Sequence, residues 1–101
     1  MSLTIAVRPE AAEDLTATRA WYEERVAGLG ERFLTAVDDF FERIRAFPEI
    51  YAVVMAGVRG GKIKRFPYIV YYRVLTDKIE ILAVLHGSRD PSVWRSRIRK
   101  A

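Results

Sequence analysis

The chain has 101 residues, of which 50% are hydrophobic and 30% charged, and its formal net charge is +4. This length suits one core and the composition is that of a globular protein, so residues 1–101 are expected to form a single domain. The absence of cysteine excludes a disulfide scaffold, a thiol nucleophile and a thiolate metal site. No apolar run approaches the roughly 20 residues of a membrane span, and the N-terminus lacks the pattern of a signal peptide. These features favour a cytoplasmic protein without a metal, a cofactor or a membrane partner.

The charges are divided unevenly along the chain. Residues 10–49 contain ten acidic and five basic side chains, whereas residues 59–101 contain eleven basic and three acidic ones. An excess of positive charge attracts anionic partners such as nucleic acid or an acidic protein segment. The second half of the chain is therefore the candidate for contact with such a partner.

The first half of the sequence predicts a strand followed by two helices. Residues 3–7 indicate a short strand, in which the larger Ile5 and Val7 alternate with Thr4 and Ala6, and Pro9 then suits the first position of a helix. The Gly-Leu-Gly at residues 28–30 ends this helix, and a second one is expected to begin near Glu31. Its apolar stripe consists of Phe33, Val37, Phe40, Ile44 and Phe47. Pro48 ends the second helix, and the short break between the two predicts an antiparallel helical hairpin.

Beyond Pro48 the period of the apolar residues changes to two, which indicates strands. Residues 51–58 are expected to form an extended connection or an edge strand. Three further strands, rich in β-branched and aromatic residues, are predicted at residues 62–65, 68–75 and 79–85. Turns at residues 66–67 and 76–77 predict an antiparallel meander, and residues 91–99 a short basic helix or tail. The fold class is therefore α+β, in the order β-α-α-β-β-β, with the helical hairpin packed on one face of a small, mainly antiparallel sheet.

The predicted turns determine which side chains share a face of the sheet. The expected cross-strand pairs are Arg73 with Glu80, Tyr71 with Leu82, Ile69 with Val84, Lys64 with Ile69, and Lys62 with Tyr71. An apolar face follows, expected to receive the helices, with Ile63, Tyr68, Val70, Tyr72, Val74, Ile79, Ile81, Ala83 and Leu85. The opposite face is mixed, cationic and aromatic, with Lys62, Lys64, Ile69, Tyr71, Arg73, Glu80, Leu82, Val84 and His86. Because helices would bury charge there, this second face is the expected working surface.

Several segments of the sequence resemble a known family. They are Val7-Arg8-Pro9-Glu10-Ala11, Trp21-Tyr22-Glu23-Glu24, Gly28-Leu29-Gly30-Glu31-Arg32-Phe33, Arg65-Phe66-Pro67-Tyr68, Val70-Tyr71-Tyr72-Arg73, Ala83-Val84-Leu85-His86-Gly87 and Arg89-Asp90-Pro91 with Trp94. Each motif alone is weak, but together they cover nearly the whole chain in the right order. The chain therefore resembles the RelE/ParE toxin superfamily, and within it the ParE-type toxins of plasmid stabilisation systems.

This resemblance implies a small cytoplasmic toxin of a type II toxin–antitoxin module, encoded beside an antitoxin whose C-terminal segment wraps and neutralises it. ParE-like members inhibit DNA gyrase, whereas RelE-like members cleave mRNA in the ribosomal A site. The two kinds share a fold, so the fold alone does not decide between them. The resemblance thus implies either a non-enzymatic inhibitor of DNA gyrase or an endoribonuclease that acts on the ribosome and its mRNA.

The residues of the RelE-like nucleases are only partly present. Lys62 and Lys64 match the Lys-x-Lys pair of those enzymes, and Arg89 matches one of their arginines. Ile69 stands where an arginine is expected, and Trp94, which has no hydroxyl, stands near the position of a late tyrosine. RNA cleavage needs an acid–base pair or cationic substitutes, together with phosphate-binding Arg or Lys. The departures therefore favour a ParE-like toxin that acts by binding.

His86 keeps the nuclease alternative open. Histidine titrates near neutral pH and so suits acid or base catalysis, and Glu80 could act with it unless Glu80 pairs with Arg73. A nuclease would use His86, Arg89, Lys62 and Lys64. The structural interpretation of His86 is a hydrogen-bonding residue at the end of a strand.

The candidate contact residues for a target or an antitoxin are Lys62, Lys64, Tyr71, Arg73, His86, Arg89 and Trp94. A structural interpretation exists for most of them: a solvated sheet face for the cations, packing beneath the C-terminal segment for Trp94, and a turn with Asp90 for Arg89. Three functions stay open, namely a gyrase-binding toxin, a ribosome-dependent endoribonuclease, and a non-toxic relative that serves as an interaction module. In every case a cognate antitoxin is the expected partner, covering an apolar groove of the helix–sheet surface.

Overall fold

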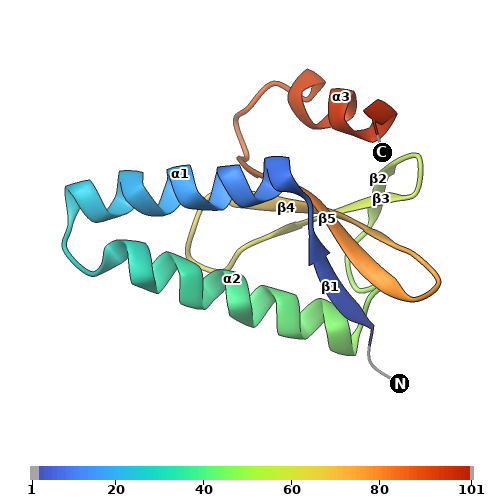
Figure 1. The fold of residues 1–101 in the computed structure, drawn as a ribbon, viewed down its shortest axis with the longest axis horizontal. Coiled ribbons are helices and arrows are strands. Elements are labelled where there is room, and N and C mark those ends of the chain that lie inside the picture. The colour runs from blue at the N-terminus through green and yellow to red at the C-terminus, as the bar shows by residue number, and fades with distance from the viewer. Residues whose placement is uncertain (1–2, 101) are drawn as a thin grey trace.

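The computed structural model describes residues 3–100, which form a five-stranded sheet and three helices (Figure 1). Across the sheet the strands are β1 (Thr4–Val7), β5 (Lys78–His86), β4 (Tyr68–Val74), β3 (Val58–Lys62) and β2 (Val53–Met55). Strand β1 runs parallel to β5, and the other neighbours are antiparallel. The helices are α1 (Pro9–Arg25), α2 (Leu29–Ala46) and α3 (Ser92–Lys100). The predicted α+β class is confirmed, and within residues 3–100 none of the helices combines the length and apolar character needed to cross a bilayer.

Helices α1 and α2 form the predicted antiparallel hairpin (Figure 1). The carboxylate of Glu23 accepts hydrogen bonds from the backbone N–H groups of Gly28 (2.8 Å) and Gly30 (3.0 Å), which lower its pKa. Gly28 is left-handed, with a φ of 86°, and a Cβ on Gly30 would lie 2.8 Å from a carbonyl oxygen of α1. The two glycines therefore permit a sharp reversal with close approach of the helices, and α2 begins at Leu29 instead of near Glu31.

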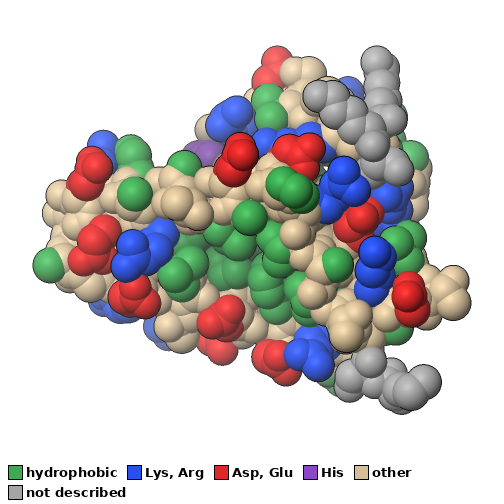
Figure 2. All heavy atoms as spheres, in the orientation of Figure 1, with side chains coloured by type: hydrophobic (Ala, Val, Ile, Leu, Met, Phe, Trp, Pro, Cys, Tyr) green, Lys and Arg blue, Asp and Glu red, His purple; other side chains and the backbone are tan. Residues whose placement is uncertain are grey.

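The core lies between the hairpin and the facing side of the sheet. Fully buried side chains of α2 (Phe33, Val37, Phe40, Ile44) meet those of the sheet (Val70, Tyr72, Ile79, Ile81, Val84). The prediction that Phe47 belongs to this buried stripe is wrong, because α2 ends at Ala46 and Phe47 is 64% exposed. On the face shown in Figure 2, apolar side chains fill the hollow between the two helices, and charged side chains flank it. Burial of this apolar surface stabilises the hairpin on the sheet.

Residues 51–58 form β2, a tight turn and the first residue of β3. Ala56 and Gly57 are the turn residues, and both are left-handed, with φ values of 49° and 78°. Two left-handed residues give a turn whose twist matches that of an antiparallel hairpin. The strand predicted at residues 62–65 therefore begins and ends earlier, at Val58–Lys62.

The turn between β3 and β4 is longer than predicted. The backbone N–H of Ile63 donates to the carbonyl oxygen of Tyr68 at 2.9 Å, so residues 64–67 all belong to the turn. The observed pairs are Lys62 with Ile69 and Gly60 with Tyr71, in place of Lys64 with Ile69 and Lys62 with Tyr71. Lys64 is thereby moved off the sheet.

A β-bulge in β5 changes the predicted register. Arg73 pairs with Glu80 as predicted, but the register then shifts by one residue at Leu82. The observed pairs beyond the shift are Tyr71 with Ala83, Val70 with Val84 and Ile69 with Leu85, so the predicted pairs of Tyr71 with Leu82 and Ile69 with Val84 are wrong. Because side chains alternate along a strand, one inserted residue moves every later side chain to the opposite face.

Beyond the bulge the predicted faces of β5 are therefore exchanged. Val84 joins the core beneath the hairpin, and His86 lies against the ring of Tyr68. Ala83 and Leu85 point to the other side, where they pack beneath α3. The face that was expected to stay free is thus partly covered by the C-terminal helix.

An ion pair between α1 and α3 satisfies the backbone groups of the bulge. Asp14 accepts hydrogen bonds from the backbone N–H of Val84 (2.9 Å) and from the guanidinium of Arg97 (2.6 Å). Arg97 also donates to the carbonyl oxygen of Leu82 at 3.2 Å. The Asp14 and Arg97 side chains are only 12% and 18% exposed. Polar backbone groups without strand partners must find others when buried, so this pair both supports the bulge and fixes α3 on the sheet.

Replacing Asp14 by Ala is expected to lower the free energy of unfolding by about 3 kcal/mol, because Arg97 and the Val84 N–H then lose their acceptor in a buried place. Urea denaturation would show a lower midpoint with an unchanged slope. Glu13→Ala, on the adjacent exposed position of α1, is the matched control and should cost less than about 0.5 kcal/mol. Equal losses in the two variants would contradict the role assigned to Asp14.

Candidate functional site

Tyr71 of β4 and Trp94 of α3 lie against each other where α3 packs on the sheet. Their rings stack with centroids 4.7 Å apart, and Trp94 is 6% exposed. Burial raises the pKa of the Tyr71 hydroxyl. This arrangement agrees with the packing interpretation of Trp94, and direct contact with a partner would require α3 to move. Their role as contact residues stays a prediction.

Arg73 is held in a charged cluster near the start of β5. The Glu80 carboxylate accepts hydrogen bonds from Arg73 (2.6 Å) and Arg8 (3.2 Å), and its side chain is 11% exposed. Burial alone raises the pKa of Glu80, but the hydrogen bonds and charges of Arg73 and Arg8 outweigh it, so the net pKa lies below its ordinary value. Glu80 therefore stays ionised near neutral pH and is a weak base.

His86 lies at the opposite end of β5. Its Nδ1 accepts a hydrogen bond from the backbone N–H of Ser88 at 3.0 Å, and its ring meets Tyr68 edge-on at 5.4 Å. In a neutral ring this leaves the proton on Nε2, which is then a donor and not a base. Six residues of strand, roughly 20 Å, separate His86 from Glu80. The suggestion that Glu80 acts with His86 is therefore wrong.

Exposed cations gather at the end of the sheet where β5 finishes. Lys62 ends β3, Lys64 lies in the next turn, and Arg89 lies in the loop after β5. The backbone N–H of Gly87 donates to the carbonyl oxygen of Pro67 at 2.8 Å, which holds the two loops side by side. We call the three side chains Lys62, Lys64 and Arg89 the cationic end. Within residues 3–100, no group of three or more His, Asp or Glu side chains is placed to hold a metal ion.

A groove of about 640 Å³ between α2 and the β3–β4 turn contains Lys64 together with charges of α2 that were not predicted as a site. Its charged lining consists of Arg32, Asp39, Arg43, Lys64 and Arg65. Arg32, Asp39 and Arg43 lie on α2 with Ala36, and all four line the groove. Each of them stands one position before a member of the buried stripe of α2. Helical periodicity therefore places these residues side by side on α2, but it does not distinguish them from the charges of a solvated helix face.

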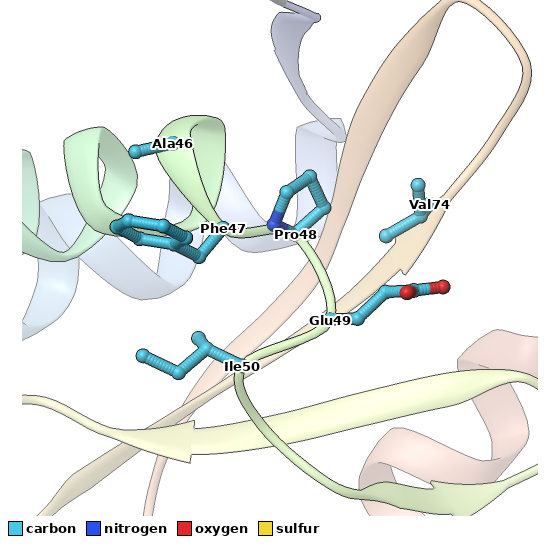
Figure 3. A pocket seen from close by; sticks show the side chains of 6 residues that line it. All are labelled: Ala46, Phe47, Pro48, Glu49, Ile50 and Val74. Carbon is cyan, nitrogen blue, oxygen red and sulfur yellow. The ribbon is translucent and has the colours of Figure 1, made fainter.

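A second hollow, of about 730 Å³, lies where α2 ends (Figure 3). In Figure 3 the Phe47 and Ile50 side chains point the same way from the loop after α2, and Val74 lies across that loop. Phe47 and Ile50, which line this hollow, are followed along the chain by the exposed apolar residues of β2. We call this exposed apolar segment the apolar edge, consisting of Phe47, Ile50, Val53, Val54 and Met55. Its strand, β2, is the last of the sheet, so one side of its backbone is unpaired within the described chain. Apolar surface on an unpaired sheet edge suits contact with a partner protein.

Comparisons with known proteins agree with this fold. The sequence matches the family described as "ParE toxin of type II toxin-antitoxin system, parDE" over residues 5–91. Toxin ParE2 of Mycobacterium tuberculosis, in strains CDC 1551 / Oshkosh and ATCC 25618 / H37Rv, is 27% identical over 99 residues, which cover 97% of this chain and 94% of the relative. The chromosomal ParDE TA system from P. aeruginosa gives a TM-score of 0.61 at 25% identity, covering 84% of this chain and 96% of that one. The YoeB dimer from Staphylococcus aureus gives a TM-score of 0.61 at 15% identity, covering 85% and 98%, and is similar in fold.

The family match, together with the similarity to the P. aeruginosa ParDE structure, therefore places the protein in the class of toxins of toxin–antitoxin systems. Because the match extends over residues 5–91, the chain belongs to the ParE toxin family of type II toxin–antitoxin systems. The resemblance in the sequence motifs is thereby confirmed. Membership in a toxin–antitoxin family also implies an antitoxin as partner.

Glu80→Gln is expected to lower the free energy of unfolding at pH 7 by about 2 kcal/mol, because Arg8 and Arg73 lose their counter-charge. The pKa of Glu80 is lowered in the folded protein, so its stabilisation is present above the ordinary pKa of 4.5 and is lost as the pH falls through the folded value. The difference between parent and variant should therefore shrink below pH 4.5 in denaturant titrations. Asp77→Asn, in the exposed β4–β5 turn, is the control. A difference for Glu80→Gln that stays constant down to acid unfolding would contradict this assignment.

Proposed function

We propose that this ParE-family toxin acts in the cytoplasm as a single domain that inhibits DNA gyrase by binding, without cleaving nucleic acid. The supporting observation is that the candidate acid–base groups are separated and already engaged. His86 uses Nδ1 to accept from Ser88, and Glu80 is held by two arginines. A site that offers exposed positive charge without a free general base is suited to binding and poorly suited to RNA cleavage.

In this proposal the cationic end and His86 contact the target. Lys62, Lys64 and Arg89 are exposed, so they can meet an anionic surface without desolvation of buried charge. Tyr71, Arg73 and Trp94 contribute indirectly in this proposal, since the Tyr71–Trp94 ring stack fixes α3 and the Arg73–Glu80 pair fixes β4 against β5 at the other end of the strand.

The antitoxin is proposed to cover the apolar edge. An extended segment can add to the unpaired side of β2, and its apolar side chains can enter the hollow at Phe47 and Ile50. Acidic residues of the same segment could then reach the cationic end.

A ribosome-dependent endoribonuclease is the second candidate function. The observation in its favour is that Lys62, Lys64, His86 and Arg89, the residues such an enzyme would use, lie toward one end of the sheet. Cleavage would then rely on cations in place of an acid–base pair.

Purified toxin is expected to inhibit supercoiling by DNA gyrase, or to trap cleaved DNA, while ribosome-bound mRNA stays intact. Lys64→Glu should weaken inhibition roughly tenfold or more, because it reverses one charge of the cationic end. Lys78→Glu, at the opposite end of β5, makes the same charge change and should have little effect.

New cuts in translated mRNA, abolished by His86→Ala or Arg89→Ala, would instead establish the nuclease. Primer extension after induction detects them. No effect on gyrase at micromolar toxin would refute the first proposal, and harmless expression without antitoxin would indicate a non-toxic relative.

Ile50→Asp is expected to weaken antitoxin binding by roughly a hundredfold, because it places a charge in the proposed apolar contact. Calorimetry with the cognate antitoxin measures the affinity. Val26→Asp is the matched control, since Val26 is 51% exposed against 52% for Ile50 but lies at the other end of the hairpin. Unchanged affinity of Ile50→Asp would exclude the apolar edge as the antitoxin site.

A further inference from the structure

We propose that the groove between α2 and the β3–β4 turn is a nucleotide-binding site, which takes a phosphate group joined through a sugar to an aromatic base. Its volume of about 640 Å³ lies within the usual range of small-molecule sites. Apart from Lys64, the side chains that carry this inference differ from those proposed for the target and the antitoxin. The inference therefore stands or falls separately from the proposed function.

Positive charge dominates the groove. Its lining includes four cations and one carboxylate, a formal charge of four minus one, or +3: Arg32, Arg43, Lys64 and Arg65, with Asp39. The ion pairs between described side chains do not use any of these five residues. Arg43 donates one hydrogen bond to the hydroxyl of Tyr51 at 2.9 Å, which directs its guanidinium and leaves other N–H groups for a ligand. A guanidinium group with free N–H groups binds phosphate oxygens through paired hydrogen bonds.

The excess of positive charge is local to the groove. Elsewhere on its surface α2 carries acidic residues, of which Glu31 pairs with Arg19 and Glu42 with Arg45. A long polyanion lying along α2 would meet these carboxylates, and like charges across an interface are costly. A compact ligand with its phosphate in the groove would not meet them. The charge pattern therefore favours a nucleotide over a nucleic-acid duplex.

Phe66 supplies an apolar wall for a base. Its half-buried ring is fixed by edge-to-face contacts with Tyr22, at 5.1 Å between centroids, and with Phe33, at 5.3 Å. Leu29 lines the same groove. An aromatic base can pack on a ring that is already immobilised at small cost in side-chain entropy, whereas an inorganic anion would leave this wall unused.

Asp39 and Thr35 add hydrogen-bonding groups that a phosphate alone cannot use. A carboxylate repels a phosphate, but it accepts hydrogen bonds from sugar hydroxyls or from the amino group of a base. The Thr35 hydroxyl donates to the carbonyl oxygen of Glu31 at 3.1 Å, so it faces a ligand as an acceptor. Cations, an apolar wall and acceptors in one groove match the three chemical parts of a nucleotide.

Arg65 adds a local constraint to this site. Its φ of 72° places a non-glycine residue in the left-handed region, which side chains with a Cβ rarely adopt. Such strain persists only where the surrounding structure holds it, and it is found mainly at functional positions. The turn thus keeps Arg65 in the groove lining at a conformational cost.

The test titrates the purified full-length chain with ATP, with GTP and with a single-stranded oligonucleotide, by calorimetry and amide NMR. Saturable binding is expected, with NMR shifts confined to residues 29–43 and 64–66. Arg32→Gln should weaken binding roughly tenfold by removing one charge-assisted phosphate contact. Arg45→Gln is the matched control on the same helix, because Arg45 is also exposed but pairs with Glu42 outside the groove, and it should leave binding unchanged. Tighter binding of ATP or GTP indicates a free nucleotide as the source, and tighter binding of the oligonucleotide a single strand.

Four results would overturn the proposal. Inorganic phosphate that binds as tightly as ATP and responds to the same variants would mean an adventitious ion only. Equal losses in Arg32→Gln and Arg45→Gln would show a response to net charge alone. A poly-glutamate peptide that binds in the groove where nucleotides do not would assign it to an acidic protein segment. Absence of saturation at millimolar nucleotide would exclude a nucleotide site of useful affinity.

Discussion

Burial of β5 on both faces is the constraint on which the rest of the structure depends. Every residue from Ile79 to Leu85 is buried, although a strand presents alternate side chains to opposite faces. The bulge at Leu82 lets Ile81 and Val84 both face the hairpin, while Ala83 and Leu85 pack against α3. The bulge also removes backbone groups from the ladder, and these are recovered by Asp14 and Arg97. Both helical layers are therefore tied to one irregularity in β5, an inner strand of the sheet.

The same irregularity decides which polar side chains are available to a partner. Before the bulge, Glu80 accepts hydrogen bonds from both Arg8 and Arg73. The two arginines neutralise the charge of its carboxylate inside the protein. After the bulge, His86 turns to the side of the hairpin and rests on Tyr68. The two groups that a nuclease would combine are thus separated in distance and in direction. Near the end of β5 the exposed charge is positive, and it is carried by the last residue of β3 and by the two neighbouring loops.

The parts of the fold that were predicted correctly are those with a strong local pattern. The α2 stripe from Phe33 to Ile44 has an unambiguous helical period. The pair of Arg73 with Glu80 lies close to the β4–β5 turn, which sets the register of these two strands. The bulge could not be predicted, because β5 is apolar at almost every position and alternation then carries no information about its faces. Val84 and His86 were assigned to the wrong face for this reason.

The groove was missed for a different reason. Arg32 and Arg43 are indistinguishable in the sequence from charges on a solvated helix face. Their grouping with Lys64 and Arg65 depends on where the β3–β4 turn packs against α2, which is a tertiary contact. The turn itself was predicted with two residues instead of four, so Lys64 was expected on the sheet.

The two surfaces proposed for partners lie near different ends of α2, and this spacing limits how an antitoxin could neutralise the toxin. Phe33, which contacts the β3–β4 turn through Phe66, and Phe47, which begins the apolar edge, are fourteen residues apart, or about 20 Å along the helix. A segment confined to the apolar edge would leave the cationic end free to meet the target. An extended chain needs about six residues to bridge such a distance. In the proposed arrangement, neutralisation requires an antitoxin segment that continues along the toxin to Lys64, where acidic residues of the antitoxin would pair with the cationic end.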